Sequence, residues 1–253
     1  MNTRAVANEF AKMRRLRVAP VAGAMVVGVV ALSCFAALGD PGFLESVDDP
    51  SEHPWRLLLA GMALAVPLTS PILLAVLASR QVDIEHQGNG WLLSQTSGLT
   101  PGHLCRAKFA ATGAVVVAAT LAQSGLVVAV GLALGVTVAF PAGQWLGYTA
   151  AAVVVNLVLL AFHLLLSARV GNQLVGLGVG VLGVFVALTS TGTPAWLTHL
   201  LPPWGYYALV TPVDARGSGM VSLDPPHLSV VALGVAGGLL FMLVTRLFDR
   251  QEA

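Results

Sequence analysis

Residues 109–136 read FAATGAVVVAATLAQSGLVVAVGLALGV and contain no Asp, Glu, Lys or Arg. This run exceeds the ~20 apolar residues that an α-helix needs to cross ~30 Å of hydrocarbon. Five further apolar runs lie at residues 18–38, 57–78, 145–168, 172–191 and 228–248, and the one charged residue in them is Arg246, close to the end of the last run. The sequence therefore predicts an all-α integral membrane protein, with residues 1–253 forming a single domain of six transmembrane helices.

The charged residues between these runs are sorted by sign. Eleven of the thirteen basic residues lie in alternate connections, on the side that holds both termini: Arg4, Lys12, Arg14, Arg15, Arg17, Arg80, Arg106, Lys108, Arg169, Arg246 and Arg250. The other connections keep Arg56 and Arg216 among the acids Asp40, Glu45, Asp48, Asp49, Glu52, Asp214 and Asp224. The positive-inside rule then places both termini in the cytoplasm.

The overall composition agrees with burial in lipid. The chain is 56% hydrophobic and 10% charged, whereas soluble domains carry about 25% charged residues. The net charge of +1 gives no reason to expect a nucleic-acid partner. Cys34 and Cys105 fall at opposite sides of the predicted membrane, so they cannot form a disulfide with each other.

The N-terminal segment, residues 1–17, is basic and amphipathic. Val6, Phe10 and Met13 form one helical stripe. Such a helix is typical of segments that lie on the lipid surface before a transmembrane span. The simpler alternative is a solvated basic tail.

The connection between the second and third spans, residues 79–108, contains helix-breaking and helix-starting signals. The sequence RQVDIEHQGNGWLLSQTSGLTPGHLCRAK at 80–108 first breaks at Gly88-Asn89-Gly90. A short helix is expected over 91–97, with Gly98 as its stop. Thr100 and Pro101 are typical of an N-cap followed by the first residue of a helix. We therefore expect an ordered hinge and not a plain linker.

The connection before the last span, residues 192–227, is rich in proline and aromatic residues, which favour the headgroup region. Its apolar part, 195–210, could dip into the outer leaflet as short helices. We expect this segment to be extracellular or re-entrant.

The sequence offers no energy source and no catalytic motif. Neither of its two lysines, Lys12 and Lys108, follows the glycine pattern of a phosphate-binding loop, and no zinc-protease or serine-hydrolase motif occurs. His163 is the one candidate for a proton relay within the predicted spans, since Arg246 lies at the end of its run. Hydrogen-bonded packing explains a lone histidine more simply than a proton relay. An enzyme is therefore not expected.

Three polar residues lie near the middle of predicted spans: the amides Gln123 and Asn156 and the hydroxyl residue Ser124. Polar groups at this depth need protein partners, because leaving them unsatisfied in lipid is costly. Contacts between helices are the simpler explanation. The alternative is that these side chains line a translocation path or a dimer seam.

The hinge resembles the corresponding loop of ABC-2-type transporter permeases, most closely those of lantibiotic and antimicrobial-peptide immunity exporters. Such permeases share the chain length, the six spans and the cytoplasmic termini. After span 2 they carry an acidic residue, a tryptophan, a short helix and a lysine that enters span 3. Here these residues are Glu85, Trp91, Leu92, Leu93, Leu104 and Lys108.

The resemblance implies a multi-pass permease of the bacterial cytoplasmic membrane that works with cytoplasmic ABC ATPase subunits and a second permease, either a copy of itself or a sister chain. It implies no cofactor in this chain, since ATP and Mg would be bound by the partner ATPase. It also implies export of an amphipathic peptide or a lipophilic compound. The alternative is an ATP-independent secondary carrier or a non-transporting membrane scaffold.

An ATPase outside the membrane can move helices only through a rigid element that is continuous with them. We therefore assign ATPase coupling to the hinge residues Asp83, Glu85, Trp91, Leu92, Leu93 and Lys108. Trp91 is expected to fill a pocket on the ATPase. Glu85 is expected to brace the hinge, paired with Arg106 or with a basic group of the ATPase.

Overall fold

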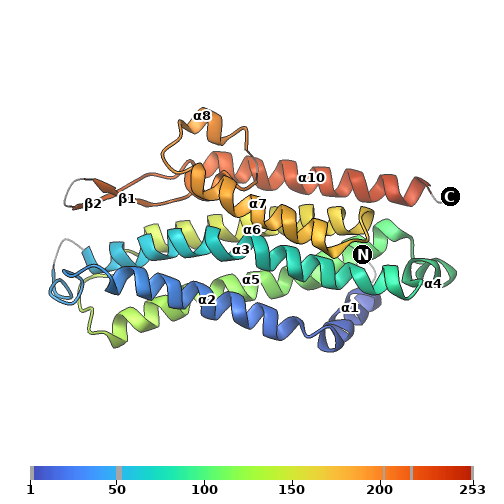
Figure 1. The fold of residues 1–253 in the computed structure, drawn as a ribbon, viewed down its shortest axis with the longest axis horizontal. Helices are drawn as coiled ribbons and strands as arrows, with labels where there is room; N and C mark the ends of the chain where they lie inside the picture. The colour runs from blue at the N-terminus through green and yellow to red at the C-terminus, as the bar shows by residue number, and fades with distance from the viewer. Residues whose placement is uncertain (1–2, 50–52, 202, 217–218, 252–253) are drawn as a thin grey trace.

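The computed structural model describes residues 3–49, 53–201, 203–216 and 219–251. Its long helices run along one common axis (Figure 1). They are α2 (Val18–Leu38), α3 (His53–Gln87), α5 (Pro101–Ala133), α6 (Ala142–Arg169), α7 (Gln173–Thr189) and α10 (His227–Gln251). The all-α membrane architecture predicted from the sequence is confirmed.

Among the described residues, five of these helices are long and apolar enough to cross a membrane: α2, α3, α5, α6 and α10. The sixth predicted span corresponds to α7, which is apolar but has 17 residues. At 1.5 Å per residue it is about 25 Å long, at the lower limit for crossing the hydrocarbon. The number of six spans therefore stays a prediction.

Both chain ends lie at the same end of the bundle as the short helix α4 (Gly90–Thr96), as Figure 1 shows. The opposite end holds the connections from α2 to α3 and from α5 to α6. This grouping agrees with the partition of charges in the sequence. Which end faces the cytoplasm stays a prediction.

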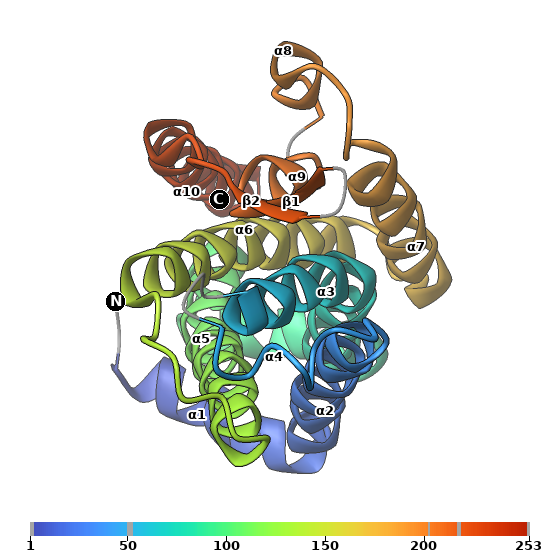
Figure 2. The same ribbon diagram turned by 90° about the vertical axis from the view of Figure 1, so that its left-hand side faces the viewer.

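Helix α3 is the central element of the bundle, with α2, α6 and α7 packed around it (Figure 2). Of its most apolar window, 61% is buried inside the protein, against 22% for α2 and for α10. Helix α10 lies at the edge, against α6 and α5. Pro67 and Pro71 lie within α3 and each removes one N–H from its backbone ladder.

The hinge between α3 and α5 forms as expected. Helix α3 continues to Gln87, and Asn89 then takes a left-handed conformation with φ of 49° immediately before α4. Gly98 follows α4 with φ of 76°, which is costly for a residue with a Cβ atom. Thr100 caps α5 by accepting a hydrogen bond from the His103 N–H at 3.4 Å, with Pro101 next in the chain. The predicted break, stop and cap are all confirmed.

The N-terminal segment forms a helix as predicted, α1 (Thr3–Arg15). Ala5, Glu9 and Met13 are buried, at intervals of four residues, whereas Phe10 is 43% exposed. This face packs against α5 and α2. Of the Val6–Phe10–Met13 stripe that was predicted to face lipid, Phe10 is exposed and Met13 is buried, and the position of α1 on the lipid surface stays a prediction. Residues 1 and 2 of the predicted 1–17 segment lie outside the described residues.

The segment before α10 contains the expected short helices, α8 (Ala195–Thr198) and α9 (Tyr206–Leu209). It also contains a hairpin that was not expected, in which β1 (Val213–Arg216) pairs antiparallel with β2 (Gly219–Ser222). The hairpin lies at the bundle end opposite α4 (Figure 1).

Candidate functional site

A buried cluster of charges joins three helices at the α4 end of the bundle. The Lys108 ammonium of α5 donates hydrogen bonds to Glu85 of α3 at 2.7 Å and to Glu9 of α1 at 2.9 Å. Its third donor goes to the backbone carbonyl of Gln81 at 2.7 Å. Because an ammonium group has three N–H donors, every donor of Lys108 is used.

The same two carboxylates also hold Lys12 of α1. Its ammonium donates to Glu9 and to Glu85, each at 2.8 Å. The cluster therefore pairs two carboxylates with two ammonium groups and is neutral overall. Lys108, Glu9 and Glu85 are 0%, 1% and 3% exposed, whereas the Lys12 side chain is 31% exposed and marks the edge nearest to water.

Helix geometry explains why these residues meet. Gln81 and Glu85 are four residues apart and therefore share one face of α3. Glu9 and Lys12 are three residues apart on α1, which crosses α5 at this end of the bundle (Figure 2). Lys108 lies about two turns into α5, opposite that face of α3. One side chain from α5 thus reaches acceptors on both neighbouring helices.

The pKa of Lys12 shows how the cluster offsets burial. Burial by itself lowers the pKa of this ammonium, but the hydrogen bonds to Glu85 and Glu9 outweigh it and raise the pKa above its ordinary value of 10.5. Lys12 is therefore charged at neutral pH. Removing one partner of a buried ion pair typically costs about 3–5 kcal/mol, because the other charge stays buried without compensation. Separation of α1, α3 and α5 at this cluster would carry a penalty of the same origin.

Arg106 belongs to a different contact from the one predicted. It donates to Asp249 of α10 at 3.0 Å and to the Thr245 hydroxyl at 3.1 Å. Residues two apart on a helix lie about 200° from each other around its axis. Arg106 therefore faces α10 while Lys108 faces α3. The expected pairing of Glu85 with Arg106 was wrong, and Glu85 pairs with Lys108 and Lys12.

The short helix α4 is attached by its tryptophan. Trp91 is half-buried, packs against the core, and contacts the His86 ring edge-to-face with centroids 5.9 Å apart. His86 in turn hydrogen bonds the Ser167 carbonyl at the end of α6, at 2.9 Å. Trp91 therefore fixes α4 against the bundle in the structure. Its predicted insertion into an ATPase pocket stays a prediction.

Leu92 and Leu93 form the free apolar surface of α4. Each is 62% exposed, and they follow one another in the chain. Leu93 also lines a groove of about 420 Å³ whose walls include Lys12, Glu85 and Leu104. An apolar edge on α4 thus adjoins a groove that leads to the charged cluster.

Asp83 lies outside the cluster. It accepts a hydrogen bond from Gln87 one turn later on the same helix. Its position on α3 is two residues from Glu85 and therefore on another face. The structure does not bring it together with the other predicted coupling residues.

The polar residues of the spans are buried inside the subunit. Asn156 of α6 donates to Thr120 of α5 at 3.1 Å and accepts from the Tyr207 hydroxyl at 2.6 Å. Ser124 shares a hydrogen bond of 2.7 Å with Thr149. These contacts favour the role in helix packing. Gln123 is fully buried and its amide has no partner among the described residues; a translocation path through these residues stays a prediction.

Sequence analysis missed Glu9, Lys12 and Gln81 as members of the cluster. The available signal was Glu9 itself, an acidic residue alone within a basic helix and three residues before Lys12. Gln81 contributes through its backbone carbonyl, which side-chain identity does not reveal.

One family model, described as "ABC-2 family transporter protein", matches residues 5–187. The match covers well over half of the chain, and it extends from α1 to within α7, so it includes the whole charged cluster and α4. No curated protein matches the chain.

Proposed function

Because this chain belongs to the ABC-2 family of transporter proteins, we propose that it is the membrane-spanning permease subunit of an ATP-driven exporter in the bacterial cytoplasmic membrane. In this proposal ATP and Mg bind to separate cytoplasmic ABC ATPase subunits, and the permease pairs with a second permease, either a copy of itself or a sister chain. Family membership supports the transport role, and the structure supports the mechanism below.

The observation that carries the proposal is the attachment of α4. This helix presents Leu92 and Leu93 outward, while Trp91 fixes it to the bundle. Immediately beside it, Lys108 and Glu85 join the helices that enter and leave the hinge. A force applied to α4 is therefore passed to α3 and α5 together.

The proposed cycle follows from this geometry. ATP binding closes the ATPase subunits, which push on α4 through Leu92 and Leu93. The charged cluster makes α1, α3 and α5 move as one unit, because separating them would leave buried charges unpaired. The shift opens an outward path for an amphipathic peptide or lipophilic compound taken from the membrane, as in the antimicrobial-peptide immunity exporters that the hinge resembles.

The second candidate is an ATP-independent secondary carrier or a scaffold. A carrier of protons or ions needs ionisable groups inside the bilayer. His163 is the group to test for that role, since it is fully buried and its ring nitrogens have no hydrogen-bond partner among the described residues. Proton-coupled transport by partner-free protein that is lost in His163→Ala would favour the carrier.

Co-purification tests the proposed function. We expect an ABC ATPase to co-purify with the wild-type chain, and Leu92→Ser/Leu93→Ser to reduce its recovery at least tenfold, because two exposed leucines would no longer fill an apolar site on the partner. Leu44→Ser is the matched control, since Leu44 is 61% exposed but lies between α2 and α3, at the opposite end of the bundle. Equal ATPase recovery with wild type and with the double variant would contradict the proposed contact between α4 and the ATPase. Full transport without any ATPase would contradict the proposal of an ATP-driven exporter.

A further inference from the structure

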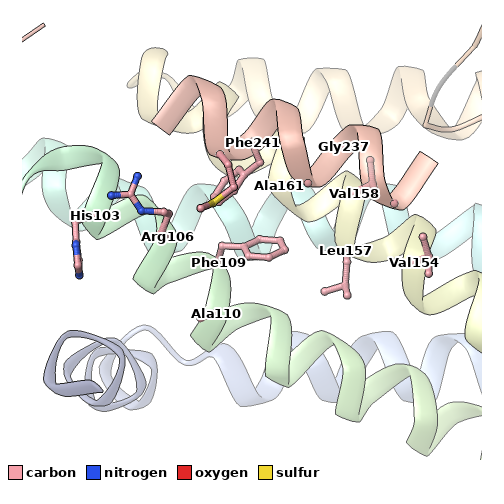
Figure 3. Close-up of a pocket in the computed structure, with 13 residues that line it drawn as sticks. His103, Arg106, Phe109, Ala110, Val154, Leu157, Val158, Ala161, Gly237 and Phe241 are labelled. Carbon is pink, nitrogen blue, oxygen red and sulfur yellow. The ribbon is translucent and has the colours of Figure 1, made fainter. Parts of the chain in front are cut away.

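A cavity of about 700 Å³ lies between α5, α6 and α10. Figure 3 shows Phe109 and Ala110 of α5, Val154, Leu157, Val158 and Ala161 of α6, and Phe241 of α10 around it. Helix α10 lies at the outer edge of the bundle (Figure 2). Most of the wall residues are half-buried, so the cavity is a slot that is open on one side. Its size falls within the ~300–1,000 Å³ of small-molecule sites.

The chemistry of the slot changes along its length. The walls are aliphatic and aromatic until the end nearest α4, where His103 and Arg106 line it (Figure 3). Arg246 is exposed and lies one helical turn beyond the wall residue Met242, on the same side of α10. The slot is therefore apolar within the bundle and basic at the end where the bundle meets water.

Asp249 is the acidic residue to weigh against these cations. It pairs with Arg106 at 3.0 Å and so offsets one positive charge. Arg246 adds a second positive charge, and Arg169 and Arg250 lie exposed at the same end of α6 and α10. Among the described residues, the mouth of the slot therefore keeps an excess of positive charge.

Two glycines of α10 show where the slot has room. A Cβ atom at Gly237 would lie 2.9 Å from a methyl carbon of Val158, which makes this the tight wall. A Cβ atom at Gly238 would meet nothing within 4 Å, although Gly238 also lines the slot. A side chain at residue 238 would therefore enter the open space without displacing the helices.

We propose that this slot holds one acyl chain of an anionic phospholipid from the leaflet on the α4 side, with the phosphate between Arg106 and Arg246. An acyl chain matches the apolar walls, and the phosphate matches the positive mouth, which is the arrangement expected of basic pockets between membrane helices. This lipid site is separate from the ATPase contact and from the transported compound. A lipid bound there would link α10 to α5 and α6 by filling the space between the three helices.

Lipid retention tests the proposal. Wild-type protein is reconstituted with equal amounts of phosphatidylglycerol and phosphatidylcholine, extracted with mild detergent, and analysed by native mass spectrometry. We expect about one phosphatidylglycerol per chain to be retained, in preference to phosphatidylcholine. Gly238→Leu should abolish retention by filling the slot. Gly125→Leu, at an exposed glycine of α5 that also has open space beside it, should retain the lipid.

The charge contribution is tested separately. Arg246→Gln should retain a lipid but lose about fivefold of the preference for phosphatidylglycerol, as expected for one basic residue near a phosphate. Arg14→Gln, at an exposed arginine of α1 on the same end of the bundle, should keep the preference. Circular dichroism checks that each variant is folded.

Three results would overturn the proposal. The first is equal lipid retention by wild type and Gly238→Leu, which would mean that the lipid is only annular. The second is an unchanged preference in Arg246→Gln. The third is a lipid-free wild-type dimer that Gly238→Leu dissociates, since a second copy of the chain would then occupy the slot.

Discussion

Lys108 of α5 donates a hydrogen bond of 2.7 Å to Glu85 of α3, although these residues are 0% and 3% exposed. They are separated by the complete hinge that contains α4. The pair therefore closes the hinge at its base, so that α4 projects from a fixed junction. Any partner that binds α4 acts on this junction.

Lys108→Met should destabilise the protein by about 3–5 kcal/mol, because Glu9 and Glu85 would stay buried after losing the ammonium that pairs with both, and Lys12 alone would not compensate them. Denaturant titration of the detergent-solubilised protein measures the change in free energy of unfolding. Lys12→Met is the matched control and should cost clearly less, since its side chain is 31% exposed and water can replace part of what is lost. Equal losses in the two variants would contradict the assigned burial.

Glu85→Gln should leave the ATPase bound and lower transport-coupled ATP turnover. The amide keeps the shape of the side chain but no longer neutralises Lys108 and Lys12, which loosens the junction without changing the surface of α4. Pull-down and turnover are measured on the same preparations. Loss of the ATPase from the complex, with normal turnover per bound ATPase, would instead make Glu85 a docking residue.

Trp91→Ala separates the two roles of α4. Half-buried Trp91 packs on the core and on His86, so its removal should release α4 from the bundle. A truncated aromatic anchor typically costs ~2 kcal/mol or more, which corresponds to roughly thirtyfold weaker assembly. Hydrogen exchange should show faster exchange of the α4 amides in the free permease. Weaker assembly with unchanged exchange would indicate direct insertion of Trp91 into the ATPase.

Labelling of single cysteines tests the orientation. In a background with Cys34 and Cys105 replaced by serine, Ser46→Cys should react with a membrane-impermeant thiol reagent in intact cells, and Ser94→Cys in α4 should react only after lysis. The reason is the charge bias, which places the α4 end in the cytoplasm. Reaction of Ser94→Cys in intact cells would reverse the orientation.

Gly102→Ala should separate α5 from α10. A Cβ atom at residue 102 would lie 1.9 Å from the Thr245 carbonyl oxygen and 2.5 Å from the Asp249 carboxylate, so the helix backbone must shift. Overpacking of this kind typically costs 1–3 kcal/mol. Gly125→Ala on the same helix meets open space and should be neutral or slightly stabilising. Thermal unfolding of both variants in the same detergent gives the comparison, and equal melting temperatures would argue against the close approach.

The sequence predicted what depends on local patterns. The apolar runs located the long helices. Gly98 located the end of α4, and Thr100 with Pro101 located the start of α5, because backbone conformation and capping act within a few residues. It also placed Glu85 and Lys108 among the hinge residues, although their pairing with each other was not part of that prediction.

The sequence failed where distant segments determine the outcome. Glu9 is buried because Lys108 neutralises it from 99 residues away, whereas amphipathicity alone assigns a carboxylate to the exposed face. Arg106 pairs with Asp249, 143 residues away in the sequence, and not with Glu85 as predicted. The β1–β2 hairpin was not predicted. Its segment is rich in proline and aromatic residues, and this composition indicated a location at the lipid headgroups and not a pair of strands.

Pro71 divides α3 into two lengths, and a proline within a helix is a common point of bending. From Pro71 to Gln87 the helix rises about 24 Å. A displacement of α4 by about 2 Å perpendicular to the axis of α3, similar to ordinary helix shifts at interfaces, would turn this half of α3 by roughly 5° about Pro71. The half of α3 before Pro71 lies against α2, where Gly61 meets the backbone of Ser33. A sideways displacement of α4 would therefore change the angle between the two halves of α3.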